Sequence, residues 1–477
     1  MAIAREHFNS RAGFILAAAG SAVGIGNLVG FPVNAAKNGG AAFLIIYAVF
    51  VLLVCLPVML AELAVGRHTQ KNPLGAYKSL IHDTDNNGSQ LWSIGGWLAL
   101  ITPYMIIIFY TVITLWVLGY FVMAATGNLD QLASDAYFGN FINSKMIFAY
   151  LLATAIIVGF ILYSGVKNGI ERAAKVMMPM LFIMLLCLVA FVLTQDNAIE
   201  GVKFYLVPNF SKITPQVINN AMGQAFFSLS LGMGILITYG SYMKQTSSIA
   251  YSAKMVALTD TTVAFTAGLL VLPAIFSFNP DINPDDLSNS SVSLIFSFLP
   301  KIFVAMQSSI GYFGASFFAS IFFLLVLIAA ITSLVSITEV PISAVMDEKK
   351  ISRKNAVIII SSTTFVFAAA AAASFGMIDA LTQFTNYGGQ SKSLFDVIID
   401  IFYETILPLN GFIICMFVIY RWKKLNLDKE LEVGDPNYQG SLLERYVNIS
   451  LTTFIPVILL LIFINTVLLK FFAFSLI

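Results

Sequence analysis

Apolar runs long enough to cross a lipid bilayer recur along nearly the whole chain, separated by short polar segments. Because a spanning helix needs about 20 mostly apolar residues, the pattern predicts an all-α integral membrane protein of about 11 transmembrane helices. The polar segment 278–300 is predicted to form a structured external loop. The predicted spans are residues 12–36, 41–66, 94–125, 145–164, 168–194, 214–242, 249–277, 305–346, 354–373, 393–420 and 449–473.

The first and sixth spans are both interrupted near the middle by small and polar residues, Gly20 to Asn27 and Ser228 to Gly234. These positions are equivalent if two five-helix halves repeat, and an odd number of helices per half inverts the second copy. Paired broken helices in inverted repeats mark the binding site of many transporters. The alternative is that the glycines only allow close helix packing. We expect one membrane domain over 1–477, with a first inverted repeat at 1–195, a second at 213–421 and a C-terminal extra helix within 422–477.

Composition narrows the possible functions. The 477 residues are 58% hydrophobic and 11% charged, whereas soluble domains usually carry about 25% charged residues. A net charge of +1 provides no basic surface for nucleic acid, and the three cysteines lie in apolar runs, which favours core packing. No nucleophile–base arrangement indicates an enzyme. Most lysines and arginines fall on one side of the membrane if the N-terminus is cytoplasmic, which is the orientation we expect.

A broken membrane helix exposes backbone groups that need a partner. The half-helix beginning near Gly26 would point its amides and its positive dipole end at the break, where a carboxylate is stabilised. Half-helices that end at the break point carbonyls inward, which suits an ammonium group or Na⁺. The pattern therefore favours a zwitterion together with a small cation.

Acidic and hydroxyl side chains within the spans are further candidates. Asp260 lies in a nearly uncharged span and needs a counter-charge, which a sodium ion would supply. For Glu62 and Glu339 we favour a structural role, and Asp400 and Glu404 are either exposed at the interface or functional. The adjacent hydroxyls Thr332 and Ser333 either bond back to their own helix or offer hard oxygen ligands to a cation. The acids and hydroxyls in question are Glu62, Asp260, Thr332, Ser333, Glu339, Asp400 and Glu404.

Several motifs resemble the neurotransmitter:sodium symporters, in particular their bacterial amino-acid-carrying branch. They are the stretch from Arg5 to Gly13, the glycine-rich breaks of spans one and six, Phe31-Pro32, Asn38-Gly-Gly40 and Gly66-Arg67. The resemblance covers about the whole chain. It implies inverted five-helix repeats and, position by position, two sodium sites, a substrate pocket and gates.

The resemblance implies the following ligands. For the first sodium they are the carbonyl of Ala22, with Asn27, Ser228, Asp260 and the substrate carboxylate. For the second they are the carbonyls of Gly20, Val23 and Ala329 with the hydroxyls of Thr332 and Ser333. The implied substrate pocket contains Ala22, Gly24, Gly26, Ile106, Tyr110, Phe227, Ser230, Met233, Ser333 and Ile337, and Phe227 would also serve as a lid. Glu62 resembles the family residue that bonds the broken backbone of span six.

The resemblance also implies an inner gate, formed by Arg5 and Asp347 with Phe8, Ser241, Tyr242 and Glu339 nearby. Gly169 and Pro179 resemble a motif for unwinding span five, and an ordinary proline kink is the alternative. The outer gate departs from the family pattern. Gly30 stands where an arginine usually pairs with the acid at position 400, so we expect Asp400 to be unpaired and the usual outer salt bridge to be missing. Lys37 is a possible substitute, although a solvated lysine is the reading we favour.

Two positions indicate what is carried. Gly24 replaces the aspartate of monoamine carriers, so the substrate should bring its own carboxylate. Ala264 replaces the serine of chloride-dependent members, whose other ligands would be Tyr47, Gln224 and Ser228, so we expect chloride-independent transport.

Together these features predict a sodium-coupled symporter of the plasma membrane (the bacterial inner membrane), using two sodium ions and alternating access to import neutral, apolar or aromatic amino acids. Its partners would be the amino acid, sodium ions and the lipid bilayer. Two alternatives stay open. One is a carrier of cationic amino acids, drawn by unpaired Asp400 and Glu404. The other is a sensor of the same fold that does not transport.

Overall fold

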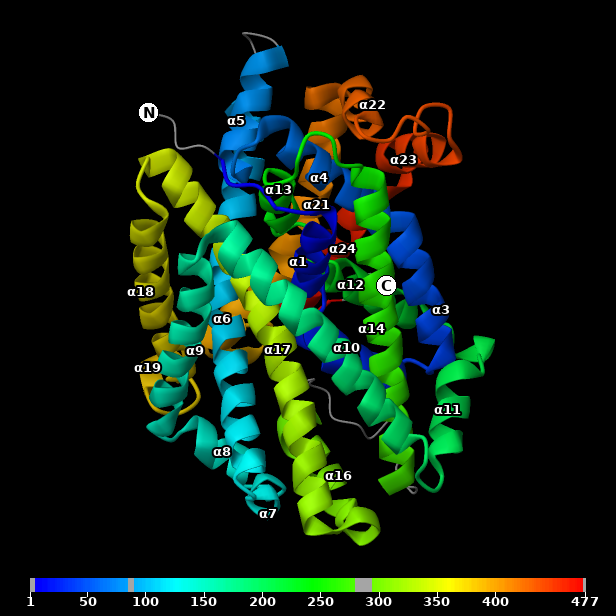
Figure 1. The fold of residues 1–477 in the computed structure, drawn as a ribbon, viewed down its shortest axis with the longest axis vertical. Helices are drawn as coiled ribbons and strands as arrows, with labels where there is room; N and C mark the ends of the chain where they lie inside the picture. Colours follow the sequence, from blue (N-terminus) through cyan, green and yellow to red (C-terminus); the bar gives the residue numbers. More distant parts are fainter. Residues whose placement is uncertain (1–4, 85–89, 279–293, 475–477) are drawn as a thin grey trace.

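The computed structural model describes residues 5–84, 90–278 and 294–474, and these residues form a bundle of long helices (Figure 1). By length and composition, nine helices could cross a membrane, or ten if the bent pair at the start of the described chain is one span. This confirms the all-α membrane class. These ten segments are α1 (Arg11–Ala22) with α2 (Phe31–Lys37), α3 (Ala41–Phe50) with α4 (Leu56–Thr69), α6 (Ser93–Ala125), α9 (Met146–Tyr163), α10 (Arg172–Val192), α14 (Ile249–Phe278), α17 (Gln307–Lys349), α18 (Arg353–Ala372), α20 (Leu394–Ile398) with α21 (Ile406–Met416), and α24 (Phe454–Phe472). The predicted sixth span is the broken pair α12 (Pro215–Ser228) and α13 (Ile235–Gly240), which is not among the ten.

Short elements connect the spans or cap their ends. Five π-helical turns continue spans: η1 (Gly26–Gly30), η2 (Val51–Cys55), η4 (Val166–Glu171), η8 (Ile399–Thr405) and η9 (Phe417–Lys423). The connecting elements are α5 (Pro73–Thr84), η3 (Gln90–Trp92), α7 (Leu129–Leu132), α8 (Tyr137–Ile142), α11 (Ala198–Leu206), η5 (Phe210–Lys212), η7 (Leu294–Phe298), α16 (Leu299–Ala305), α19 (Asp379–Thr382), the hairpin strands β1 (Thr385–Tyr387) and β2 (Gln390–Lys392), α22 (Lys424–Glu432) and α23 (Leu442–Thr452). The predicted loop at 278–300 falls largely on residues 279–293, which lie outside the described residues.

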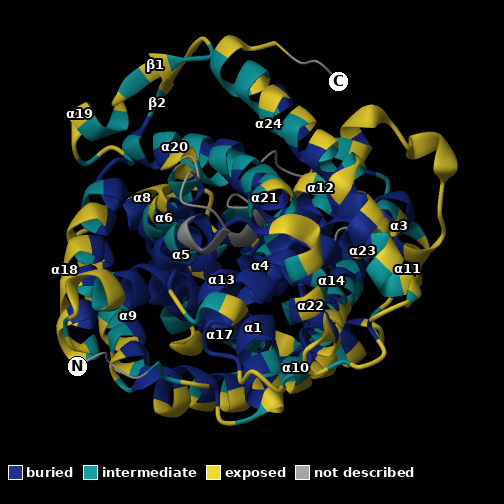
Figure 2. Ribbon diagram, turned by 90° about the horizontal axis from the view of Figure 1, so that it is seen from above, coloured by how far each residue is buried: buried dark blue, intermediate teal, exposed yellow. Residues whose placement is uncertain are grey.

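The bundle has a buried centre and an apolar outer ring. Seen end-on, α1, α4, α13 and α17 lie at the centre, and α9, α10, α11, α18 and α24 lie toward the edge (Figure 2). The most apolar window of α17 is 83% buried, whereas that of α9 is only 28% buried. Apolar side chains exposed on the ring, such as Phe160, suit contact with lipid. Cys187 is also exposed, so its expected place in the core was wrong, while Cys55 and Cys415 are buried.

Both central breaks are real interruptions of the helices. In span one, α1 ends at Ala22, Val23 is extended, and the two halves are bent by 55°. In span six, α12 ends at Ser228, and Gly232 and Gly234 adopt positive φ values of 74° and 65° before α13 begins. A Cβ at Gly232 would lie 2.6 Å from the carbonyl oxygen of Leu407, so both conformation and close packing require glycine there.

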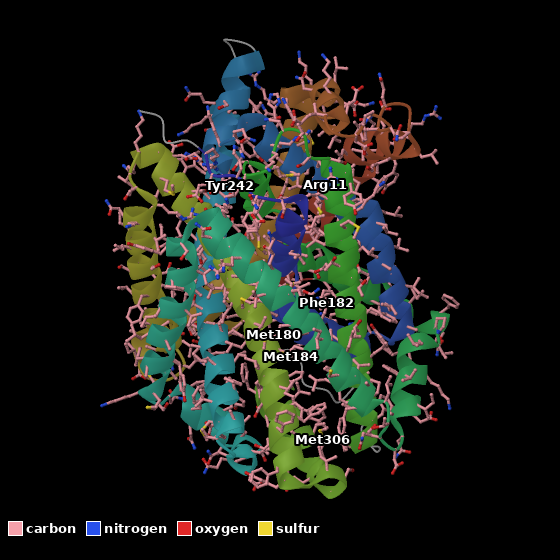
Figure 3. The ribbon with its side chains drawn as sticks, viewed as in Figure 1. Arg11, Met180, Phe182, Met184, Tyr242 and Met306 are labelled. Atoms are coloured by element: carbon pink, nitrogen blue, oxygen red, sulfur yellow. The ribbon has the colours of Figure 1, made fainter. Side chains whose placement is uncertain are left out.

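One end of the bundle contains a fully buried arginine. Arg67, near the end of α4, has no exposed side-chain surface and pairs with Glu430 of α22 at 2.6 Å. Its guanidinium also donates to the carbonyls of Ser247, Glu430 and Val433. The end of the second span is therefore tied to a segment more than 360 residues later. Arg11 and Tyr242 lie toward this end of the molecule and Met306 toward the other (Figure 3).

Candidate functional site

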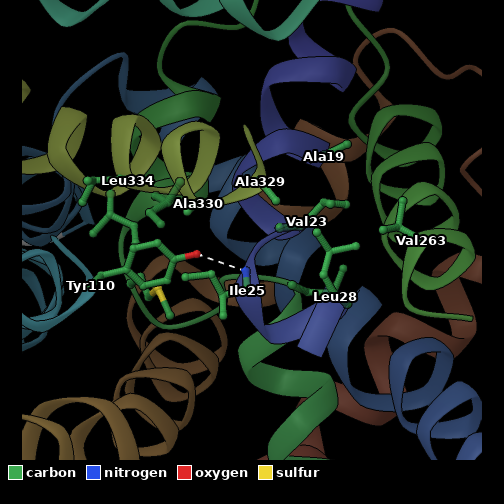
Figure 4. Packing of buried hydrophobic residues seen from close by; sticks show 14 of the residues in the cluster. Ala19, Val23, Ile25, Leu28, Tyr110, Val263, Ala329, Ala330 and Leu334 are labelled. Carbon is green, nitrogen blue, oxygen red and sulfur yellow. Dashed lines mark hydrogen bonds between the residues drawn. The ribbon is translucent and has the colours of Figure 1, made fainter. Parts of the chain in front are cut away.

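The break in span one gathers backbone carbonyls around one hydroxyl. The Oγ of Ser333, on α17, lies 3.4, 3.0 and 3.3 Å from the carbonyl oxygens of Gly20, Ser21 and Val23. On the other side of the break, the Ile25 amide donates to the hydroxyl of Tyr110 on α6 at 3.3 Å (Figure 4). Carbonyls thus face α17, and a freed amide faces α6.

Thr332 completes an all-oxygen group beside Ser333. Its hydroxyl bonds back to the carbonyls of Ile328 and Ala329, at 3.1 and 3.0 Å, so the back-bonding expected of a helical threonine does occur. A Cβ built on Gly20 would lie 3.4 Å from the Thr332 Cβ, which places the two residues in direct contact. Gly20, Val23, Ala329, Thr332 and Ser333 are therefore brought together, and they offer the oxygen donors that a hard cation prefers.

A second polar group surrounds Asp260 of α14. Its Oδ1 accepts from the Asn27 amide at 2.7 Å, and its Oδ2 accepts from the hydroxyls of Ser228 and Tyr47 at 2.8 and 3.1 Å. Asn27 in turn accepts from the Gly24 amide at 3.2 Å, which ties the group to the break. Asp260 is fully buried and forms no ion pair with any described residue. A buried carboxylate without a counter-charge is costly, so this group favours a bound cation.

Side chains also satisfy the broken backbone of span six. The Gly232 amide donates to Oε1 of Glu62 at 2.8 Å, and the Gly232 carbonyl accepts from Asn410 at 2.8 Å. The contact expected for Glu62 is confirmed. Ser230, at a positive φ of 55°, donates to the Ser21 carbonyl at 3.1 Å and so joins the two breaks.

Two aromatic rings enclose the space beside the breaks. A Cβ on Gly24 would lie 2.7 Å from the Tyr110 hydroxyl, and one on Gly26 would lie 2.8 Å from Cε1 of Phe227. Neither glycine could therefore carry a side chain without displacing a ring. The other expected pocket residues are buried, at 5% exposure or less: Ala22, Ile106, Ser230, Met233, Ser333 and Ile337.

Tyr403 is a site residue that sequence reasoning missed. Its ring meets Phe227 edge-on with centroids 4.3 Å apart, and it also packs on Phe109 at 5.6 Å. The available signal was its position between the two acids Asp400 and Glu404 on η8. Tyr403 therefore joins η8 to the Phe227 ring at the break of span one.

The expected inner-gate residues do lie together, in what we name the Arg5 cluster: Arg5, Phe8, Ser241, Tyr242 and Asp347. Arg5 forms an ion pair with Asp347 at 2.6 Å, donates to Ser241 at 2.6 Å and lies 4.6 Å from the centroid of the Tyr242 ring. Phe8 packs edge-on against Tyr242, and its amide donates to the Tyr242 carbonyl at 3.1 Å.

Glu339 lies beside the Arg5 cluster and bonds one of its members, Tyr242. Its carboxylate accepts from the Tyr242 hydroxyl and pairs with Arg353, both at 2.6 Å. Glu339 is fully buried, and these partners satisfy it. Sequence reasoning assigned no part to Arg353, the first residue of α18.

The outer acids differ from expectation: Asp400 is paired. Lys470 of α24 lies 3.0 Å from Asp400 and 2.5 Å from Glu404, and Lys392 of β2 lies 3.2 Å from Asp400. The expectation of an unpaired Asp400 was wrong, because Lys392 and Lys470 both pair with it although Gly30 carries no charge. Lys37 is partly buried and forms no ion pair with a described residue, so it does not substitute for the missing arginine in this structure. We name the group Asp400, Glu404, Lys392, Lys470 and Tyr387 the Asp400 cluster.

Gly169 and Pro179 both lie in the fifth span, in a helix that is continuous. Gly169 belongs to the π-helical turn η4, where a Cβ would lie 1.9 Å from the Ile161 carbonyl oxygen. Pro179 is inside α10. The close approach explains the glycine, and the unwinding of this segment stays a prediction.

A bundle with two broken central helices, oxygen-rich groups at the breaks and clusters of charge at its ends defines a multi-pass membrane transporter. The family model of the sodium:neurotransmitter symporter family matches residues 5–139 and 140–472. The chain belongs to this family, which consists of sodium-dependent transporters and not of enzymes.

Relatives and a solved structure agree with this assignment. An uncharacterized sodium-dependent transporter of Bacillus subtilis, YhdH, is 34% identical over 432 residues, which is 89% of this chain and 90% of that protein. A sodium-dependent transporter of Methanocaldococcus jannaschii, MJ1319, is 36% identical over 74% of this chain and 72% of its own length. The crystal structure of MhsT in complex with L-phenylalanine is similar with a TM-score of 0.82 and 34% identity, covering 97% of this chain and 99% of that one.

Proposed function

We propose that this protein is a sodium-coupled symporter that imports neutral, apolar or aromatic amino acids by alternating access. The observation that carries the proposal is the pair of polar groups at the break of span one. One is the all-oxygen group around Ser333, and the other is the buried, unpaired carboxylate of Asp260. Both groups lie beside backbone amides and carbonyls that have no helical partner at the break. Ions and substrate would therefore bind next to one another at this break.

In this proposal each group holds one sodium ion. The first would bind the Ala22 carbonyl, Asn27, Ser228, Asp260 and the substrate carboxylate, so that substrate completes the site. The second would bind the carbonyls of Gly20, Val23 and Ala329 with the hydroxyls of Thr332 and Ser333. Hydrogen bonds that now join these oxygens to one another would be replaced by bonds to the cation.

The substrate class follows from the lining of the pocket. Gly24 leaves the Tyr110 hydroxyl and the Ile25 amide to meet a carboxylate carried by the substrate. Apolar Ile106, Phe227, Met233 and Ile337 would surround its side chain, where an unpaired ammonium would be costly to desolvate. The crystal structure of MhsT contains L-phenylalanine, and this supports the same substrate class for the present chain. Pairing of Asp400 and Glu404 with lysines weakens the case for a carrier of cationic amino acids.

Chloride independence is part of the proposal. Ala264 offers no hydroxyl, and the Asp260 carboxylate already bonds Tyr47 and Ser228, two of the groups a chloride ion would need. Replacing chloride by gluconate should leave sodium-driven uptake within about twofold of its value, since a fixed charge of the same sign is present. A large loss of uptake in gluconate would contradict this.

The membrane arrangement is proposed from the charge distribution and the repeats. The N-terminus would be cytoplasmic in the plasma membrane, with inverted repeats at 1–195 and 213–421 and an extra helix within 422–477. The Arg5 cluster would then form the inner gate and the Asp400 cluster would lie on the outer side.

Uptake of radiolabelled leucine, methionine or tryptophan into proteoliposomes with a sodium gradient tests the proposal. Thr332→Ala combined with Ser333→Ala should abolish sodium-driven uptake, because two oxygen ligands are lost. The matched control is Thr262→Ala with Thr266→Ala, two hydroxyls of α14 that only bond back to their own helix. Undiminished uptake in the first pair, or wild-type uptake that is the same in K⁺ as in Na⁺, would contradict sodium coupling. Substrate binding without any uptake would favour a sensor.

A further inference from the structure

The Asp400 cluster is built from three parts of the chain that sequence reasoning did not connect. Asp400 and Glu404 lie on η8, Lys392 ends the hairpin strand β2, and Lys470 lies near the end of α24. The hairpin and α24 lie along one edge of the bundle (Figure 2). Lys470 contacts both acids, and its formal charge together with that of Lys392 balances theirs.

The cluster is a packed contact and not a loose surface pairing. The Asp400 side chain is only 6% exposed, and that of Lys470 is 27% exposed. The Tyr387 hydroxyl donates to Asp400 at 2.9 Å, and the Tyr387 ring packs on Phe471 with centroids 5.0 Å apart. Burial and the nearby Asp400 raise the pKa of Tyr387, so its hydroxyl stays protonated as a donor. A Cβ on Gly388 would lie 2.5 Å from the Lys470 carbonyl oxygen, which shows how closely the hairpin meets α24.

The same turn of helix reaches the break of span one. Tyr403 lies between the two acids on η8, and its ring packs on Phe227 at 4.3 Å. Phe227 in turn lies over Gly26. Lys470 is thus linked through η8 and Tyr403 to the ring above the break.

We propose that Lys470 is a positioning and specificity-determining residue for the outer entrance. It holds η8 so that Tyr403 covers Phe227, and it neutralises the acids that would otherwise attract a second ammonium group. The last span would therefore supply the cation that this chain lacks at position 30. The inference rests on the proposed function, because it concerns entry to the same pocket.

The two parts of the role can be measured separately. The effect of the charge is measured by competition against sodium-driven uptake of labelled leucine. The competition ratio is the lysine concentration that halves this uptake divided by the leucine concentration that halves it. Position is measured as the rate at which a membrane-impermeant thiol reagent labels the variant Ala22→Cys. This variant is made in a background that carries Cys55→Ala, Cys187→Ala and Cys415→Ala. The labelling rate needs no knowledge of the substrate.

Lys470→Met should shift the competition ratio about fivefold toward lysine, as expected for loss of about one kcal/mol of pairing at a partly exposed site. It should also raise the labelling rate about threefold, because Tyr403 is held less firmly. Lys470→Arg should restore both values. Lys470→Met combined with Glu404→Gln restores the charge balance, so it should return the competition ratio to the wild-type value while labelling stays fast.

Lys203→Met is the control, because it removes an exposed ion pair with Glu200 on α11 that does not touch the Asp400 cluster. If Lys470→Met leaves both the competition ratio and the labelling rate at the Lys203→Met level, the inference is wrong. If Lys470→Met does not assemble, Glu404→Gln removes one of the lysine's two partners and should raise labelling, and unchanged labelling would overturn the inference. Wild-type protein without sodium-driven uptake of neutral amino acids would contradict the proposed function, and the labelling rate would still test the role of Lys470.

Discussion

Ion pairs form at both ends of the bundle, but they join different parts of the chain. The Arg5 cluster connects the segment before α1 to α17, two regions 342 residues apart in sequence. The Asp400 cluster connects η8 to the hairpin and α24, all in the last quarter of the chain, and no described ion pair links Asp400 to span one. Arg353 opens α18 beside Glu339 and the hairpin follows the far end of that helix, so the clusters are separated by its length of about 30 Å.

The difference indicates that different interactions hold span one at the two ends of the bundle. At the Arg5 end, charge and aromatic contacts hold the start of span one directly against its neighbours. At the Asp400 end, the Phe227 ring lies over Gly26 and Tyr403 packs on Phe227. Neutral hydrogen bonds also join span one to α12 there, from Gln224 to the Gly26 carbonyl and from Asn34 to Gln224.

The largest expected effect is at the Arg5 end. Arg5→Ala removes the ion pair with Asp347, the bonds to Ser241 and the contact with Tyr242 at once. Sodium-driven uptake in proteoliposomes should fall more than about tenfold, because Asp347 keeps its hydrogen bonds from Asn72 but loses the counter-charge that Arg5 supplies. Lys78→Ala, which breaks the exposed pair with Glu348, is the control and should change uptake little. If Arg5→Ala and Lys78→Ala showed equal uptake, the ion pair of the Arg5 cluster would not be needed for transport. The two ends of the bundle would then not differ in their dependence on ion pairs.

An intermediate effect is expected at the lid. Phe227→Ala removes the ring that lies over Gly26 and meets Tyr403. The apparent affinity for the amino acid should weaken about tenfold while the sodium dependence is kept, since aromatic truncation removes packing but no ligand of the ions. Phe210→Ala, at an exposed ring in η5, is the control. If the affinity of Phe227→Ala equals that of wild type, closure at this end does not depend on the ring.

The smallest effect is expected at Lys37, the cation on span one nearest in sequence to the missing arginine at position 30. It has no ion-pair partner among the described residues, so Lys37→Met should keep uptake and affinity within about twofold of wild type, because no charge pair is broken. An effect as large as that of Lys470→Met would mean that an ion pair does cross to span one during transport. In that case an ion pair would hold span one at both ends of the bundle.

The arrangement of the breaks could be predicted because its signals are local. Glycines inside an apolar run mark an interrupted helix, and a lone acid such as Asp260 in an uncharged span marks a polar group that needs partners. The resemblance to the symporter family, and not a local signal, placed Asn27 and Ser228 beside Asp260, and both do bond it. Their roles as sodium ligands stay predictions.

The partners of Asp400 could not be predicted, because no local signal in the sequence marks them. Lys392 and Lys470 reach it only because a short hairpin folds back on the end of a later helix, and neither the register of the hairpin nor the rotation of α24 is written in a periodic pattern. The π-helical turn η8 adds a further shift, since it changes which residues share a face with Tyr403. Long-range geometry decides these contacts, and sequence spacing does not report it.

The buried pair of Arg67 and Glu430 has a consequence for biosynthesis. A ribosome finishes Arg67 when only the first two spans exist, and the acid that satisfies it is added more than 360 residues later. During that interval the guanidinium must remain in water or among lipid headgroups, because a buried unpaired charge is too costly. The end of the second span therefore settles into its final position only after the tenth span has been made.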